Sequence, residues 1–245
     1  MDFELIKNIR IDDEESWKHK IFLTFDMEWS NDNILEYLLN YIDRYSLKAT
    51  VFVTHKTQLL ERMKKSPNIE LGIHPNYNFL LEGDFRYGSN FDEVTSYYYN
   101  LVENPISVRS HSMTQNSRIV QNFSQYGLIY DCNHFIPIDS GIELKPWKYW
   151  NEKMIKIPYI WEDDIHLSKS KKVKASDLLS YDGLKVLDFH PLQIFINTHK
   201  IENYYKVLKT KEYKKNVNQV YYGIRDYLND IITLVKENRR KTCKN

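Results

Sequence analysis

The stretch Lys20-Ile-Phe-Leu-Thr-Phe-Asp-Met-Glu-Trp29 constrains this chain most, because a run of strand-forming residues ends in two carboxylates. An unpaired carboxylate is costly to bury, so Asp26 and Glu28 should lie where the strand leaves the sheet. Side chains alternate along a strand, which places Asp26 and Glu28 on one side and turns Met27 and Trp29 away. Of two carboxylates on one side, one can bind a cation while the other accepts or donates a proton. The alternative is that the strand simply ends in two solvated acids that have no function.

The composition is that of a globular protein. The chain has 245 residues, of which 42% are hydrophobic and 27% charged, and a net charge of +1. This gives no electrostatic reason to expect nucleic acid or an acidic membrane surface as a partner. We find no apolar segment typical of a signal peptide and no stretch suited to a membrane-spanning helix. Cys132 and Cys243 are far apart and predict reduced thiols, so we expect a cytoplasmic protein without stable membrane insertion.

Strand patterns alternate with helix patterns along the chain. Strands are predicted at residues 21–25, 48–54, 69–75, 106–112, 128–131, 153–161 and 184–190. Helices are predicted at residues 34–45, 56–65, 91–102, 117–126 and about 217–239. Connections of helix length imply parallel strands with helices outside. We therefore predict one α/β domain over residues 1–245, with a core at about 20–200 and a barrel-like sheet whose active site lies at the C-terminal rim.

Four of these strands end in two polar residues separated by one position. The pairs are Asp26 and Glu28, His74 and Asn76, Arg109 and His111, and Asp188 and His190. Each pair shares one side of its strand, and parallel strands bring all four exits to one rim. A carboxylate and two imidazoles with an open position form the ligand set of a catalytic zinc or similar divalent ion. A single histidine at a strand end is more often structural, so the hypothesis depends on the joint arrangement.

Several of these segments resemble motifs of the polysaccharide deacetylases, the chitooligosaccharide deacetylase homology domain. The similar segments are Thr24-Phe-Asp-Met-Glu28, Lys48-Ala-Thr-Val-Phe-Val53, Glu70-Leu-Gly-Ile-His74, Gly127-Leu-Ile-Tyr-Asp131, Ile157-Pro158 and Leu187-Asp-Phe-His-Pro191. They follow the family's order over about residues 21–198, and they are most similar to bacterial surface-polysaccharide deacetylases of the O-antigen type. The resemblance implies a distorted (β/α) barrel of about seven parallel strands. It also implies metal-dependent hydrolysis of the amide of an N-acetylated sugar.

The resemblance implies catalytic roles for three of the residues. Asp26 is expected to be the general base, Arg109 to orient that base, and His190 to be the general acid. Asp164 is expected to anchor His190 or Arg109. Asp188, which shares a strand face with His190, is expected to hold the His190 ring and to raise its pKa.

The expected metal ligands are Glu28, His74 and a third residue, with zinc the first candidate for the divalent ion. The family usually supplies its second histidine four residues after the first, and this chain has Asn78 there. His111 can replace it, whereas an amide such as that of Asn78 is a weaker zinc ligand. The residues predicted to bind substrate are Trp29, Asn76, Asn78, Trp161 and Asp164.

We therefore expect a carbohydrate N-deacetylase of bacterial surface-glycan biosynthesis, of O-antigen or capsule type. Its expected partner is an N-acetylated sugar or sugar conjugate, and no nucleic acid. Two alternatives stay open. One is a non-catalytic glycan-binding protein on a deacetylase fold, and the other is a deformylase or another C–N amide hydrolase of the same fold. The sequence identifies neither the sugar, nor its carrier, nor the oligomeric state.

Overall fold

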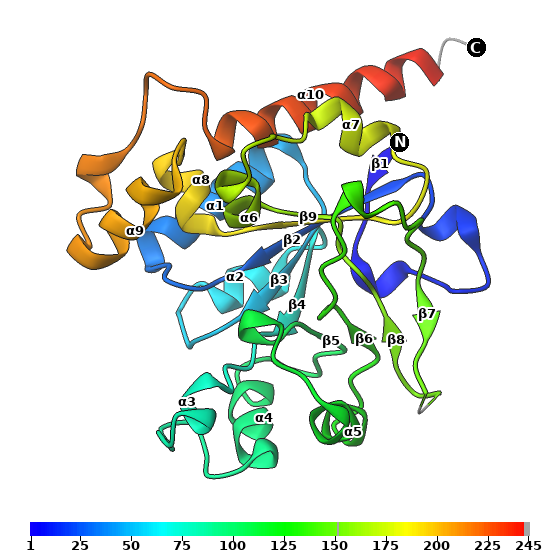
Figure 1. Ribbon diagram of the computed structural model, residues 1–245, viewed down its shortest axis with the longest axis vertical. Helices are drawn as coiled ribbons and strands as arrows, with labels where there is room; N and C mark the ends of the chain where they lie inside the picture. Colours follow the sequence, from blue (N-terminus) through cyan, green and yellow to red (C-terminus); the bar gives the residue numbers. More distant parts are fainter. Residues whose placement is uncertain (151, 243–245) are drawn as a thin grey trace.

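A curled sheet runs through the computed structural model, which describes residues 1–150 and 152–242 (Figure 1). The strands are β1 (Asp2–Phe3), β2 (Lys20–Asp26), β3 (Ala49–Val53), β4 (Ile69–Ile73), β5 (Ser107–Val108), β6 (Tyr130–Asp131), β7 (Trp147–Lys148), β8 (Ile155–Lys156), β9 (Trp161–Glu162) and β10 (Lys185–Phe189). They lie in the order β7-β8-β6-β5-β4-β3-β2-β10-β9, with β1 beside β2. Neighbours are parallel except β7 and β8. This half-barrel of parallel strands confirms the predicted barrel-like α/β fold.

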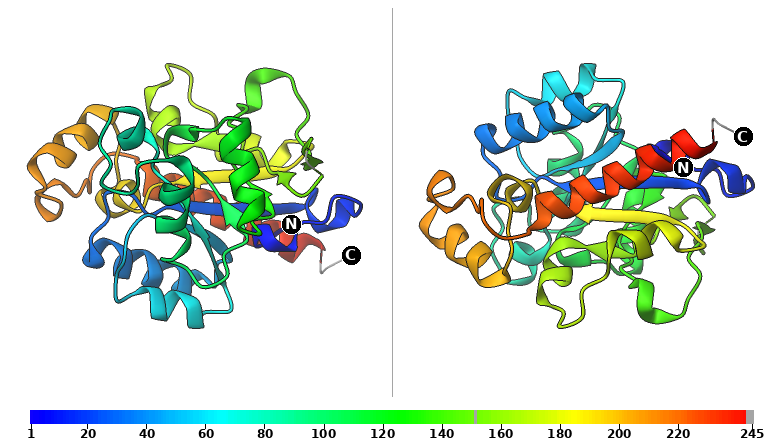
Figure 2. Two further views of the ribbon diagram at one scale, coloured as in Figure 1. Left: turned by 90° about the horizontal axis from the view of Figure 1, so that it is seen from below. Right: turned by 90° about the horizontal axis from the view of Figure 1, so that it is seen from above.

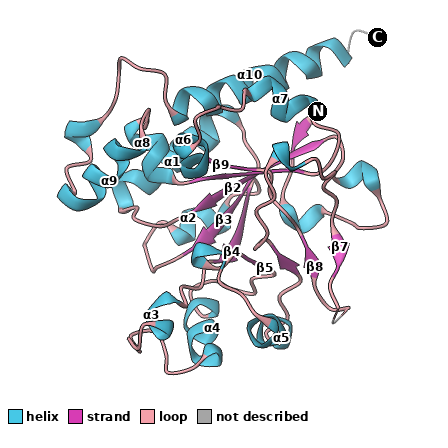
Figure 3. Cartoon of the chain, viewed as in Figure 1, coloured by secondary structure: helices cyan, strands magenta, loops and turns pink. Residues whose placement is uncertain are grey.

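Helices surround the strands, as Figure 3 shows. They are α1 (Asp32–Tyr45), α2 (Leu60–Lys65), α3 (Asn78–Leu81), α4 (Phe91–Tyr99), α5 (Ser117–Gln125), α6 (Asp163–Ser168), α7 (Ala175–Ser180), α8 (Pro191–Ile196), α9 (Ile201–Thr210) and α10 (Ile224–Thr242). The long helix α10 packs on α7 and α8 and crosses one face of the domain (Figure 2). None of the described helices is long and apolar enough to span a membrane.

The central strands are almost completely buried, which agrees with their apolar sequences. Strand β2 pairs in parallel with β3 on one side and with β10 on the other, so that Phe25 lies beside Val51 and Phe189. Parallel pairing sends the carboxyl ends of these strands to the same edge. The residues that follow β2, β4, β5 and β10 therefore meet at this edge, as the strand-exit pattern predicted.

The largest differences in length between predicted and observed elements concern three segments. The segment 106–112 contains only the short strand β5, and the extended segment 153–161 is divided between β8 and β9. The last helix begins at Ile224 rather than at about 217. The preceding loop exposes 83% of Val220, so this residue does not belong to the buried stripe of the helix. Cys243 lies outside the described residues.

A small second apolar cluster joins helices α1, α8 and α9 near the same edge of the sheet. It is separate from the main core, and its buried members are Ile34, Leu192, Ile196, Tyr204 and Val207. Helix α1 starts here because the side chain of Asn31 accepts a hydrogen bond from the Ile34 N–H at 3.2 Å, which caps the helix. The cluster fixes α9 beside the strand exits.

Candidate active site

Strand β2 delivers three residues to the site within four positions. Asp26 ends the strand and is 4% exposed, and Glu28 is 7% exposed. Met27 points into the core, as predicted, but Trp29 does not turn away from the carboxylates. Its backbone adopts a left-handed φ of 53°, and its ring stacks on His190 and meets the edge of His111, with ring centroids 5.6 and 5.9 Å away. The alternation breaks here because the strand has already ended.

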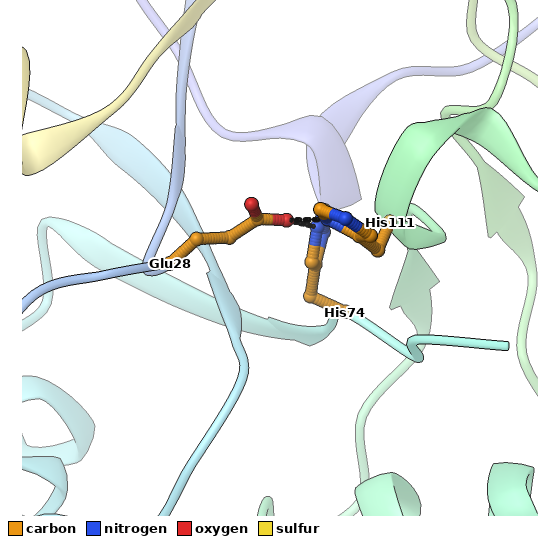
Figure 4. A group of neighbouring side chains, drawn as sticks. All are labelled: Glu28, His74 and His111. Carbon is orange, nitrogen blue, oxygen red and sulfur yellow. Dashed lines mark hydrogen bonds and ion pairs between the residues drawn. The ribbon is translucent and has the colours of Figure 1, made fainter. Parts of the chain in front are cut away.

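Glu28, His74 and His111 converge on one point (Figure 4). Glu28 Oε1 contacts His74 Nε2 and His111 Nδ1, and the candidate ligand atoms all lie within 4.8 Å of one another. Burial opposes ionisation of Glu28, but the two imidazoles outweigh it and lower its pKa. One carboxylate and two imidazoles from three separate strand exits fit a divalent ion that retains open positions for substrate.

Asn78, the alternative third ligand, has another role in this structure. Its Oδ1 accepts a hydrogen bond from the Thr114 hydroxyl at 3.1 Å, and its Nδ2 donates to Ser112 Oγ at 3.3 Å. Ser112 belongs to the short turn of residues 111–113, which carries His111, and Thr114 follows that turn directly. Ser112 and Met113 have positive φ angles in that turn. The Asn78 amide therefore braces the turn that presents His111, and this supports His111 as the ligand.

Arg109 holds Asp26 from the interior of the half-barrel. Its guanidinium donates to Asp26 Oδ1 at 3.1 Å and to Thr24 Oγ1 at 2.8 Å, and it contacts Asp188 Oδ1. The rings of Phe52 and Tyr159 lie 4.7 and 4.5 Å from the guanidinium carbon. Burial opposes the charge of Arg109, but the two carboxylates outweigh it and raise its pKa, so it stays a cation. The predicted role of Arg109 in orienting Asp26 agrees with this geometry.

His190 is held by Asp163, a residue that the sequence analysis did not select. Asp163 is fully buried, and its carboxylate accepts hydrogen bonds from the backbone N–H and the Nδ1–H of His190, both at 2.7 Å. Gln193 Nε2 adds a third donor at 3.0 Å. Burial lowers the pKa of His190, but Asp163 outweighs it and raises the pKa well above its ordinary value. The predicted anchoring of the ring by Asp164 or Asp188 is wrong, because Asp164 Oδ1 has no hydrogen-bond partner among the described residues and Asp188 pairs with Arg109. Asp188 does raise the pKa of His190 further, as predicted.

The remaining predicted substrate-binding residues occupy different positions. Trp161 is 2% exposed and stacks on Tyr227 at 4.9 Å, so it has no surface to offer a sugar, and this prediction is wrong. Asn76 is partly buried, and its Oδ1 accepts from the Asn78 N–H at 3.0 Å. Asp164 is partly buried beside the carboxyl of Glu162.

A depression of about 850 Å³ lies beside Trp29, lined by polar and aromatic residues that include His55, Lys211 and Tyr213.

A buried polar network behind the site was also missed. Asp131 forms an ion pair with Lys156 and accepts a hydrogen bond from Asn133 Nδ2 at 2.7 Å. Asn133 Oδ1 in turn accepts from the Ser110 N–H at 2.7 Å. This network fixes the backbone between Arg109 and the His111 turn. The only sequence signal for it was a lysine and an aspartate in neighbouring predicted strands.

The comparisons with known proteins agree with this geometry. No curated protein matches the sequence. Residues 23–209 match the WbmS-like polysaccharide deacetylase family. A crystal structure from Bordetella bronchiseptica, of a protein described provisionally as a polysaccharide deacetylase involved in O-antigen biosynthesis, is 35% identical in sequence. The match covers 95% of this chain and 97% of that one, with a TM-score of 0.87. The chain belongs to the WbmS-like polysaccharide deacetylase family.

Proposed function

We propose that this protein is a metal-dependent carbohydrate deacetylase that removes the N-acetyl group from an amino sugar in surface-glycan biosynthesis of the O-antigen type. The observation that supports it most is the position of the Glu28–His74–His111 group. Asp26, a carboxylate held by an arginine, lies 3.5 Å from His74 Nδ1. His190, an imidazole held by a carboxylate, stacks on the Trp29 ring that also contacts His111. An amide hydrolase needs a base and an acid on either side of the reacting carbonyl.

Glu28, His74 and His111 would hold a divalent ion, for which zinc is the first candidate. When bound, the ion polarises the acetamide carbonyl and increases the acidity of water. Asp26 accepts a proton from the attacking water, and Arg109 keeps its carboxylate aimed at that position. As the C–N bond breaks, His190 donates its Nε2 proton to the leaving nitrogen, because an amine leaves poorly as an anion. The products are acetate and the free amino sugar.

The aromatic ring of Trp29 is the first candidate surface for the sugar. It is 44% exposed and lies against both His190 and His111. An apolar sugar face packed on this ring would place a substituent between the acid and the ligand group. The depression beside Trp29 would accommodate the rest of the sugar or its carrier.

Acetate release tests the proposal. The protein is stripped with a chelator, reloaded with zinc or cobalt, and incubated with N-acetylglucosamine, N-acetylgalactosamine and their nucleotide-linked forms. We expect acetate and free amine in equal amounts, only after reloading, and none from the Asp26→Asn variant. Formate from N-formyl sugars would indicate the deformylase alternative. A protein that binds these sugars but takes up no stoichiometric metal would instead be a glycan-binding member of the family.

A further inference from the structure

A cavity of about 570 Å³ lies between the start of α10 and residues 166–176, which include the end of α6 and the start of α7 (Figure 1). None of the residues assigned above to the ligand group or to acid–base catalysis lines it. Its volume is within the range of about 300–1,000 Å³ that is usual for pockets that hold small molecules. The cavity is therefore large enough for a ligand of its own.

The wall of the cavity is mostly apolar. Val173, Ile224 and Leu234 contribute aliphatic side chains to it. The ring of Tyr227 contributes an aromatic face and is fixed in place, because it stacks on Trp161 at 4.9 Å and its hydroxyl donates to the Val173 carbonyl at 2.9 Å. A wall of this kind favours a ligand with an apolar body, since such a ligand removes apolar surface from water.

His166 brings an unused hydrogen-bond donor to the cavity. The residue is 9% exposed, and its Nδ1 accepts a hydrogen bond from the Trp161 Nε1–H at 3.1 Å. Burial and the charges of Lys172 and Lys169 lower the pKa of His166 to about 4, so the ring is neutral. Because an indole N–H only donates, the single ring proton of His166 is on Nε2. This Nε2–H has no hydrogen-bond partner among the described residues, although buried donors are nearly always paired.

The ammonium group of Lys172 is the second donor at the cavity. It donates to two carbonyl oxygens near the end of α6, at 2.6 and 2.5 Å, and its third proton remains for a ligand. Lys174 adds a second positive charge to the wall. Asp230 adds a negative charge, but its carboxylate already accepts a hydrogen bond from the Tyr222 hydroxyl at 2.6 Å. Unused donors and an excess of positive charge fit an anion and disfavour a cation.

We propose that this cavity binds a small molecule that has an apolar body and one anionic head group. The head group accepts hydrogen bonds from His166 Nε2 and Lys172 Nζ, and the body packs against the apolar wall between the loop and α10. The site is separate from the proposed deacetylase centre, so its test does not depend on that activity.

Two fluorescent probes with the same ring skeleton test the head group. They are 8-anilino-1-naphthalenesulfonate, an anion, and N-phenyl-1-naphthylamine, which lacks the sulfonate. At physiological ionic strength we expect one anion to bind per chain, and the neutral probe to bind at least tenfold more weakly. Lys172→Gln should weaken binding of the anion at least tenfold and leave that of the neutral probe unchanged. Lys171→Gln is the matched control, because this exposed neighbouring lysine does not line the cavity, and it should keep the wild-type affinity.

Two further measurements place the bound anion. Leu234→Trp fills the cavity and should abolish saturable binding of both probes while the circular dichroism spectrum stays that of the wild type. In protein labelled with ¹⁵N-histidine, the His166 Nε2 resonance should shift when the anion is added.

Four results would overturn the inference. They are no saturable binding of the anion by the wild type, equal affinities for the two probes, wild-type affinity for the anion in Lys172→Gln, and an unshifted His166 resonance at saturation. Wild-type binding by a folded Leu234→Trp variant would place the anion elsewhere and would overturn it as well. If that variant does not fold, the comparison of the two probes in Lys172→Gln decides.

Discussion

Replacing Asp163 with asparagine should move the basic limb of the pH–rate profile to lower pH. The amide nearly preserves the shape of the carboxylate and can still accept a hydrogen bond from the His190 ring. It removes the negative charge that holds the pKa of His190 well above its ordinary value. Without the charge of Asp163, burial is the main influence on the ring and lowers the pKa of His190. The general acid should therefore lose its proton at a lower pH in the variant.

The size of the effect depends on the fraction of the His190 ring that is protonated at each pH. Activity requires the protonated ring, so it is present below the pKa of His190 and lost as the pH rises through it. A histidine with the ordinary pKa of about 6.5 is only about 3% protonated at pH 8. The wild-type ring, with its raised pKa, keeps most of its proton to a higher pH. We expect kcat/KM of Asp163→Asn to fall about tenfold or more at pH 8 and clearly less at pH 6.

The assay is acetate release measured from pH 5 to pH 10 for the zinc-loaded wild type and variant. Asp139→Asn is the control, because Asp139 is an exposed carboxylate that pairs with Lys169 away from His190. Its profile should match that of the wild type. An Asp163→Asn variant with an unshifted basic limb would refute the assignment of Asp163, and an unshifted limb in His190→Ala would remove His190 as the acid.

Three further substitutions test other parts of the site. His111→Ala should keep the fold, by circular dichroism, and lose stoichiometric metal by elemental analysis; full occupancy would exclude His111 as the third ligand. Asp26→Asn should retain metal but lower kcat about 10²- to 10⁴-fold, whereas near-wild-type turnover would assign the base elsewhere. Gly72→Ala should lower the melting temperature by about 2–10 °C, because the new methyl group would lie 2.7 Å from both the Ser107 carbonyl oxygen and the Phe52 ring that supports Arg109. An unchanged melting temperature would mean that the Phe52 ring and the backbone at Ser107 both move without cost.

The strand exits were predictable because the geometry of a parallel sheet is repetitive. Side chains two positions apart share a face, and parallel strands end at a common edge, so spacing alone brought Asp26, Glu28 and His74 together. His111 was selected by the same rule but reaches Glu28 from a turn beyond the strand, whose left-handed residues the pattern does not reveal. The edge was therefore predicted more reliably than the path of the chain beyond it.

The partners of the catalytic residues could not be predicted in this way. Glu162, Asp163 and Asp164 follow one another, and only the starting residue of α6 decides which of them faces His190. A shift of one residue rotates a helix position by about 100°, and sequence patterns do not place helix ends that accurately. Asp188 was placed on the correct face of its strand, but a buried arginine from another strand competed for it.

The balance of buried charge explains why this site suits a divalent ion. Four buried carboxylates lie around it, those of Asp26, Glu28, Asp163 and Asp188. They face Arg109, His190 and also His74: burial lowers the pKa of His74, but Asp26 and Glu28 outweigh it and raise that pKa. Burial raises the pKa of Asp188 to about 8 despite the contact with Arg109, and the nearby carboxylate of Asp26 adds to the effect. An ion of charge +2 held by Glu28, His74 and His111 would supply the positive charge that a protonated His74 otherwise supplies, because a histidine ligand binds metal as the neutral imidazole. The ligand group and the acid–base pairs are therefore parts of one electrostatic unit, in which a bound ion would take the place of the proton on His74.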